Sequence, residues 1–281
     1  MTTTDADTLK SQVKQHWERE TCGTRYAEAT DRGAYFDEVS RARATLEPYI
    51  SEFADFPSAT SKRVLEIGVG AGSDFEQWCR FADHATGVDL TQAAIRLTAE
   101  RLELRGVPRT KFELRVADAE ALPFAPTSFD LVWSWGVLHH TPRTEVAMAE
   151  VHRVLRPGGQ FRGMIYHDRS WTALMLTAEQ IARQRTVRVT RRRAVADLLE
   201  SPGTKLYSRR EAEIMMRAVG FTDVKVRTTL GPGDLLSIRP SSRYSGRGMQ
   251  LLWKAYPRPI VRLLGDRFGM NLMITATRSD R

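Results

Sequence analysis

A glycine-rich stretch near residue 70 holds the residues best suited to ligand chemistry. Gly68, Gly70 and Gly72 follow the apolar run 64–67, and Ser73 then opens an expected helix. Glycine is needed in such a turn because a side chain would block close approach of a ligand, and because the turn can require positive φ. A dinucleotide-binding fingerprint has its third glycine at the position of Ser73, one residue after Gly72. The spacing therefore disfavours a pyrophosphate cradle, although plain helix–strand packing stays an alternative.

Two carboxylates follow the next two expected strands. Asp89 ends the run 84–89, and Asp118 follows the run 111–116. Ligands of an open α/β sheet bind outside the carboxyl ends of its strands. Asp89 can accept two hydrogen bonds from the hydroxyls of one ribose, and Asp118 can accept one from an adenine amino group. The alternative for each carboxylate is a helix cap, which is a frequent role for Asp at this place.

Histidines follow two further expected strands. His139 and His140 come after the run 129–134, and His167 comes after the run 160–166. Histidine is the side chain best suited to act as a general base near neutral pH. We expect these histidines to lie at the same end of the sheet as the carboxylates. The alternative is a structural role, with a ring bonded to the backbone.

The elements that must position these residues alternate along the chain. Apolar runs predict strands at residues 63–67, 84–89, 111–116, 129–134, 160–166, 224–228 and 270–277. Helical spacing predicts helices at residues 8–50 with a break at 22–24, and at 75–82, 92–105, 144–154, 209–219 and 256–264. The alternation predicts an α/β fold with a parallel sheet that helices cover on both faces.

Four segments are expected from this pattern. They are an N-terminal helical segment at residues 1–60, a ligand-binding core at 61–167, a helical cap insertion at 168–208, and the C-terminal part of the core sheet at 209–281. The stretch 231–247 is rich in Gly, Pro, Ser and Arg and is expected to be a long loop.

A chain of 281 residues can hold one large α/β domain with an insertion, or at most two small domains. No apolar run approaches the ~20 residues of a membrane helix, and the polar N-terminus does not resemble a secretory signal. The two cysteines, Cys22 and Cys79, have no histidine partners at metal-ligand spacing. We therefore expect a cytoplasmic protein with reduced thiols, no metal site and no membrane partner.

The formal net charge of +8 raises the question of a nucleic-acid partner. The basic residues are most concentrated in the arginine run 183–193. No aromatic residue interrupts this run, so it offers no platform on which bases could stack. We expect a solvated helix rather than a nucleic-acid site, with an acidic substrate or partner as the alternative.

Taken together, these motifs resemble those of the class I S-adenosylmethionine (SAM)-dependent methyltransferases that act on small molecules, of the methyltransferase type 11-like family. The resemblance runs from Val64 to Tyr166. Its motifs are residues 65–72, 87–89, 117–119, 129–132, 137–140 and 153–159. It implies a Rossmann-like, seven-stranded, mostly parallel sheet whose last strand runs antiparallel, with an N-terminal helical segment and a helical cap insertion.

The resemblance also implies roles for individual residues. Gly68, Gly70 and Gly72 would lie under the methionine part of SAM, Glu66 would support the turn or bond the ammonium group, and the backbone near Ser134 would face the methionine. The other cofactor-binding positions implied are Asp89 and Leu90 at the ribose, and Asp118 and Ala119 at the adenine. No metal is implied, and S-adenosylhomocysteine would be the product.

Related sugar and natural-product O-methyltransferases look similar at His140 and His167, so these are the expected bases, with His139 next. Segments outside the core should close the acceptor site. The expected lining residues are Trp17, Tyr26, Tyr35, Phe36, Trp171, Met175 and Tyr207, with ordinary packing as the alternative for each. Their character predicts an apolar or aromatic metabolite, and the N-terminal helices can also serve a homo-oligomer.

Several functions stay open at this point. Oxygen is the expected methyl acceptor, with carbon of an alkene, a prenyl group or an electron-rich ring as the first alternative. An RNA or protein methyltransferase, a SAM-binding protein without catalysis and an NAD-dependent oxidoreductase are the others. Residues 134–137 read Ser-Trp-Gly-Val, unlike the Asn/Asp-Pro-Pro-Tyr/Phe type of motif that accompanies amino-group methylation of bases.

Overall fold

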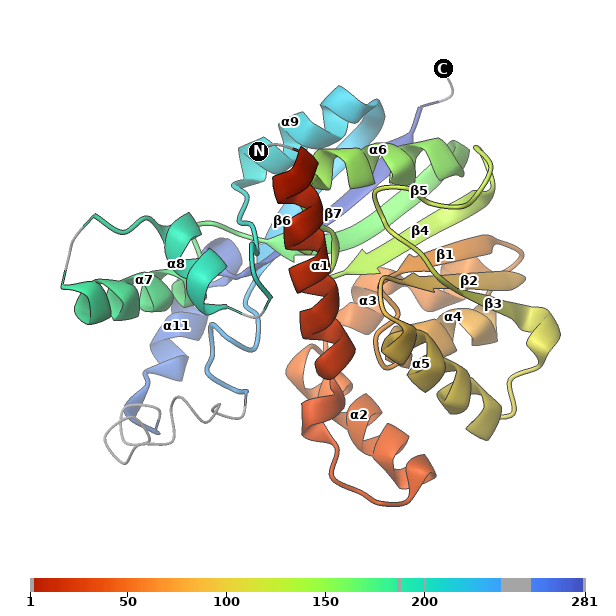
Figure 1. Ribbon diagram of the computed structural model, residues 1–281, viewed down its shortest axis with the longest axis horizontal. Coiled ribbons are helices and arrows are strands. Elements are labelled where there is room, and N and C mark those ends of the chain that lie inside the picture. The colour runs from red at the N-terminus through yellow and green to blue at the C-terminus, as the bar shows by residue number, and fades with distance from the viewer. Residues whose placement is uncertain (1–2, 186–187, 200, 239–253, 280–281) are drawn as a thin grey trace.

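The computed structural model describes residues 3–185, 188–199, 201–238 and 254–279. Its centre is a seven-stranded sheet in the order β3-β2-β1-β4-β5-β7-β6 (Figure 1). The strands are β1 (Arg63–Ile67), β2 (His84–Asp89), β3 (Phe112–Val116), β4 (Phe129–Trp135), β5 (Leu155–Tyr166), β6 (Phe221–Thr229) and β7 (Asn271–Arg278). The first five strands run parallel, and β7 runs antiparallel to both β5 and β6. The expected fold class is confirmed.

Helices cover both faces of the sheet because alternate strand residues point to opposite sides. On β1, Leu65 packs in the core cluster of α6 (Thr144–Val154) and α9 (Arg209–Val219). Its neighbour Val64 packs in a second cluster with α4 (Ser73–Phe81), α5 (Gln92–Leu104) and α3 (Ile50–Ala54). Figure 1 shows these two groups of helices on opposite sides of the sheet.

The remaining helices lie outside these two layers. The N-terminal segment forms α1 (Thr3–Arg19), η1 (Thr24–Tyr26), α2 (Arg32–Leu46), α3 and η2 (Phe56–Ala59). The cap contains α7 (Trp171–Gln184) and α8 (Arg191–Leu198), and Figure 1 places α11 (Arg258–Leu264) at the same end of the molecule. Short turns of 3-10 helix complete the chain at η3 (Arg109–Lys111), η4 (Leu138–His140) and η6 (Asp266–Phe268).

Several expected boundaries differ from the structure. β5 begins at Leu155 rather than at residue 160, because Leu155 pairs with Phe129 and the register then shifts before Leu131. β6 begins at Phe221 rather than at residue 224, directly after α9 ends. Residues 231–238 form turns and loop, whereas the rest of the loop expected to residue 247 lies outside the described residues.

One buried carboxylate fixes the loop 231–238 to its surroundings. Asp234 accepts hydrogen bonds from the backbone amides of Thr172, Gly231 and Met270, at 2.9, 2.9 and 2.6 Å. These amides belong to α7, to the loop itself and to the start of β7. The loop is therefore joined to both the cap and the sheet.

Three of the six arginines in the run 183–193 bind carboxylates. Arg183 lies 2.6 Å from Glu179, Arg192 binds Glu211, and Arg193 binds Asp197. In the part of the chain that the structure describes, no helix has the length and apolar character needed to span a bilayer.

Candidate active site

A cavity of about 710 Å³ opens at the carboxyl ends of the parallel strands. The ends of β1, β2 and β4 contribute Ile67, Asp89 and Trp135 to its wall, and β5 contributes Tyr166. The segments that cover it are α1, η1, α2, α7 and the loop 231–238. The cavity therefore lies where an open α/β sheet binds its ligands.

The three glycines after β1 have different reasons to be glycine. Gly68 lines the cavity at φ +85°, and a Cβ there would lie 2.2 Å from Cγ2 of Val137. Gly70 also lines the cavity, at φ +52°, and its amide donates to Oδ2 of Asp89 at 3.2 Å. Gly72 is not part of the lining. A Cβ on it would lie 3.0 Å from the side chain of Thr98, so glycine there allows α5 to pack against the loop.

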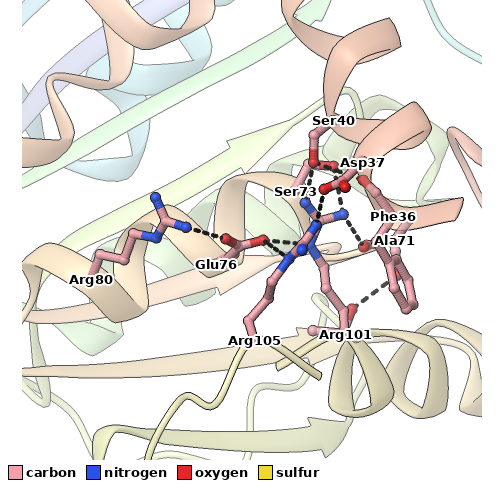
Figure 2. Close-up of polar contacts among 11 residues, drawn as sticks. Phe36, Asp37, Ser40, Ala71, Ser73, Glu76, Arg80, Arg101 and Arg105 are labelled. Atoms are coloured by element: carbon pink, nitrogen blue, oxygen red, sulfur yellow. Dashed lines mark hydrogen bonds and ion pairs between the residues drawn. The ribbon is translucent and has the colours of Figure 1, made fainter. Parts of the chain in front are cut away.

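Two side chains of α5 bond the carbonyls of the glycine loop, and Figure 2 shows one of them, Arg101, with its partners. The Thr98 hydroxyl donates to the Gly70 carbonyl at 3.0 Å, and the buried Arg101 donates to the Ala71 carbonyl at 3.2 Å. Arg101 also binds Glu76 of α4 at 2.8 Å and the hydroxyl of Ser40 on α2. One guanidinium thus joins the loop, two core helices and the N-terminal segment.

Glu66, at the end of β1, is the clearest sign of a missing partner. It is 3% exposed and lines the cavity, and its Oε2 has no hydrogen-bond partner among the described residues. Burial and the nearby Asp74 raise the pKa of Glu66 well above its ordinary value, and Arg43 opposes this only in part. A buried acceptor without a partner is costly. The position therefore suits a ligand with a cationic donor, such as an ammonium group.

The other expected cofactor positions divide into two groups. Asp89, Leu90, Asp118 and Ala119 all line the cavity. Ser134 does not, because its hydroxyl donates to the Ile67 carbonyl at 3.1 Å and the side chain is buried. Its neighbours Trp135 and Gly136 line the cavity in its place.

The three histidines occupy distinct places. His140 lines the cavity, and its Nδ1 lies 2.8 Å from the Ser201 hydroxyl and 3.0 Å from the Thr204 hydroxyl. His139 is fully buried against the ring of Tyr166 at 4.0 Å, and burial holds its pKa well below the ordinary value. His167 lies outside the lining, where its Nδ1 donates to the Gly269 carbonyl at 3.1 Å. Of these three, His140 alone lines the cavity, and His16 of α1 lines it as well.

The expected acceptor-site residues also separate. Trp17, Tyr26 and Met175 line the cavity, and the Trp17 ring lies 5.5 Å from the His140 ring. Trp171 packs on Phe268 instead, at 5.9 Å. The residues that stay outside the lining are Tyr35, Phe36, Trp171 and Tyr207. These four residues therefore fit the alternative of ordinary packing better than a role in lining the acceptor site.

Sequence reasoning missed two charged residues that line the cavity, Arg43 in α2 and Glu47 directly after it. Arg43 binds Asp74 at 2.6 Å and also binds Glu47, and Glu47 accepts from the Trp135 indole at 3.0 Å. Arg43 and Glu47 are four residues apart, which is the spacing of a pair on one helix face. That spacing is a signal, but it does not show which face meets the core.

The part of the chain that the structure describes holds no cluster of three or more potential metal ligands.

A family model described as a methyltransferase domain matches residues 65–162. The probable phthiotriol/phenolphthiotriol dimycocerosates methyltransferase 2 of Mycobacterium ulcerans is 32% identical over 192 residues, which are 66% of this chain and 70% of the relative. The fatty-acid O-methyltransferase of Mycolicibacterium smegmatis is 36% identical over 127 residues, 44% of this chain and 43% of the relative.

A solved structure gives the same result for the fold. The phosphoethanolamine N-methyltransferase 2 of Haemonchus contortus, in complex with phosphomonomethylethanolamine and S-adenosylhomocysteine, superposes with a TM-score of 0.60 at 19% identity. The match covers 95% of this chain and 60% of that protein. The order of the strands, the cavity at the glycine loop and the similarity to the M. ulcerans relative all indicate the same family. The chain belongs to the class I SAM-dependent methyltransferases.

Proposed function

We propose that this enzyme transfers the methyl group of SAM to an oxygen atom of a small, apolar, lipid-like molecule. Bound SAM supplies a methyl group on a positively charged sulfur. Glu66 would accept from the ammonium group, since its Oε2 is otherwise without a partner in the described residues. Asp89 would accept from a ribose hydroxyl at Oδ2, because its Oδ1 already accepts from the amide and the hydroxyl of Thr91. Leu90 would lie beside it, and Ala119 would contact the adenine.

Asp118 keeps capacity for the adenine amino group. Its Oδ1 accepts from the Glu120 amide at 2.9 Å, and its Oδ2 accepts from the Lys10 ammonium group at 2.6 Å. Each carboxylate oxygen has a second lone pair. A further donor can therefore bind there without displacing either contact.

The environment of His140 carries the proposal of oxygen as the acceptor. The Thr204 hydroxyl donates to the Ser201 carbonyl at 2.7 Å, so it accepts where it bonds Nδ1 of His140, and the Ser201 hydroxyl, 2.8 Å from the same Nδ1, can accept as well. We infer from these contacts a proton on Nδ1 and a lone pair on Nε2, an atom that the fold buries. That tautomer can take a proton from an acceptor hydroxyl as the new bond forms.

The acceptor end of the cavity is apolar. Beyond His140 the cap and the loop 231–238 contribute mostly apolar side chains to its wall, with Thr172 as a polar one. The apolar ones include Met175, Leu176, Leu198, Leu199, Leu236 and Ile238. Such a wall suits an alkyl chain or a ring without charge. Two relatives of this chain are named for lipid-like substrates, the dimycocerosates and the fatty acids. Both observations support an apolar acceptor.

The test is transfer of labelled methyl from SAM into a cell extract that is separated into organic-soluble molecules, nucleic acid and protein. We expect label in the organic-soluble fraction, and mass spectrometry of that fraction then locates the methyl group. Label in RNA or protein instead would overturn the proposal.

The accepting atom is tested with His140→Gln. For an oxygen acceptor, loss of the base lowers kcat by about 100-fold, while the Kd for SAM stays unchanged. Full turnover in this variant would favour transfer to carbon, which can begin without a base.

A further inference from the structure

Helix α11 carries an apolar face that the described part of the chain leaves exposed. Ile260, Leu263 and Leu264 are 57%, 86% and 48% exposed, and the spacing i, i+3, i+4 puts them on one side of the helix. Val261 is 3% exposed and holds another side of the helix against the fold. Three large aliphatic side chains together on one helix face mark a contact surface more strongly than scattered ones do.

The charge around this face is basic. Residues 254–268 include Lys254, Arg258, Arg262 and Arg267 but only one acidic residue, Asp266. Arg262 and Arg267 are exposed. An apolar face flanked by Lys and Arg is the pattern of a helix that lies in the interface of an anionic bilayer.

The helix is also fixed to the wall of the cavity. The Tyr256 hydroxyl, just before α11, donates to the Asp234 carbonyl at 2.7 Å, and Arg258 donates to the Leu236 carbonyl at 3.0 Å. Leu236 lines the apolar end of the cavity. The start of helix α11 therefore adjoins the loop that bounds the acceptor site.

We propose that α11 docks on the surface of an anionic lipid bilayer. Ile260, Leu263 and Leu264 enter the boundary between headgroups and acyl chains, and Arg262 and Arg267 lie at the anionic headgroups. This departs from the expectation of no membrane partner, which rested on the lack of a spanning segment. Docking would deliver an apolar acceptor to the loop 231–238, and this purpose rests on the proposed function. The docking itself does not depend on it.

The test is co-sedimentation of the full chain with phosphatidylcholine vesicles, with and without phosphatidylglycerol. We expect binding to the vesicles that contain phosphatidylglycerol, and weaker binding as salt rises. The double variant Ile260→Asp, Leu263→Asp should bind at least about tenfold more weakly. Arg262→Glu should weaken binding about fivefold or more at low salt.

Ile214→Asp is the matched control, because Ile214 on α9 is 56% exposed and Ile260 is 57% exposed. It should leave vesicle binding unchanged, and SAM binding measured for every variant reports that the fold is intact. Equal loss with Ile214→Asp, or no binding to anionic vesicles, overturns the proposal. Sedimentation velocity tests the alternative of a dimer. If the protein forms dimers that only the α11 variant dissociates, and it does not bind vesicles, the apolar face is a contact with a second copy of the chain and the proposal fails. Vesicle binding with no label in the organic-soluble fraction would overturn the proposed function alone.

Discussion

The Lys10 ammonium group on α1 lies 2.6 Å from Oδ2 of Asp118, at the end of β3, although 108 residues separate them in the chain. It also lies 2.9 Å from Glu120, whose side chain is buried. Burial lowers the pKa of Lys10, but the bonds to the two carboxylates outweigh this and raise it overall. At the C-terminal end of α1, Glu18 accepts from the amides of Gln92 and Ala93. Helix α1 is therefore held at its middle and at its C-terminal end.

Lys10→Ala should loosen α1 and speed the release of SAM. Partly buried ion pairs of this kind contribute about 1 kcal/mol, which corresponds to roughly fivefold in the dissociation rate. Stopped-flow measurement of SAM release, with hydrogen exchange of the α1 amides, tests this. Lys14→Ala is the control, since Lys14 lies on the same helix and is exposed. Equal effects of the two substitutions would show that the Lys10 contacts do not hold the helix.

Thr98→Val should weaken SAM binding by about tenfold, because it leaves the Gly70 carbonyl without its hydrogen bond and shifts the glycine loop. Thr98→Ser keeps the hydroxyl and should restore most of the affinity. Calorimetric titration with SAM gives both values. A fall in kcat at saturating SAM, with unchanged affinity, would contradict a role in positioning this loop.

Arg101→Met should lower the free energy of unfolding by about 3 kcal/mol, because it leaves a buried carboxylate with poorer partners. Arg80→Met should cost less than about 1 kcal/mol. Arg80 binds the same Glu76 at 2.6 Å, but it is 57% exposed and Arg101 is 1% exposed. Urea unfolding of both variants checks the difference, and equal losses would rule out the burial argument.

SAM binding should release a proton from Glu66. Burial raises the pKa of this carboxyl, so the empty site favours its protonated form, whereas a bound ammonium group favours the carboxylate. Affinity should therefore rise with pH over the range below the ammonium pKa of about 8. Calorimetry in buffers of different ionisation enthalpy counts the released protons. Glu66→Gln should abolish the release, and an unchanged proton count in that variant would refute the assignment.

Thr204→Val should lower kcat by about tenfold, because it removes one of the two hydroxyls that set the tautomer of His140. The Kd for SAM should not change. His167→Gln serves as the comparison, since His167 lies outside the cavity lining and its substitution should leave kcat near the wild-type value. A larger loss with His167→Gln than with Thr204→Val would return the base role to His167.

Much of the core could be predicted from local pattern. The bounds of β1, β2 and α6 agree with the prediction to the residue. In buried strands and in an amphipathic helix, the spacing of apolar residues shows the element within a short stretch of sequence. The glycine loop and the carboxylates after β2 and β3 were predicted to meet because the carboxyl ends of parallel strands share one edge.

Contacts between distant segments could not be predicted in this way. The turn η4 directs His140 into the cavity and His139 into the core, and no periodicity separates two adjacent histidines. Arg101 looks like an ordinary charged residue of α5, and only the packing of α2 and α4 around it makes it a buried centre. Thr204 contacts His140 only because the fold brings together two residues that are 64 positions apart in the chain.

The position of β7 has a consequence for how the chain is made. β7 lies between β5 and β6, so β6 joins the sheet only through a strand that follows it by some 40 residues. As the chain leaves the ribosome, β1 to β5 can pair in the order of their synthesis, whereas α9 and β6 must wait with an unpaired edge. Met270 and Gly269, which bond Asp234 and His167, arrive with β7. The cofactor half of the enzyme can thus assemble early, and the substrate half is completed last.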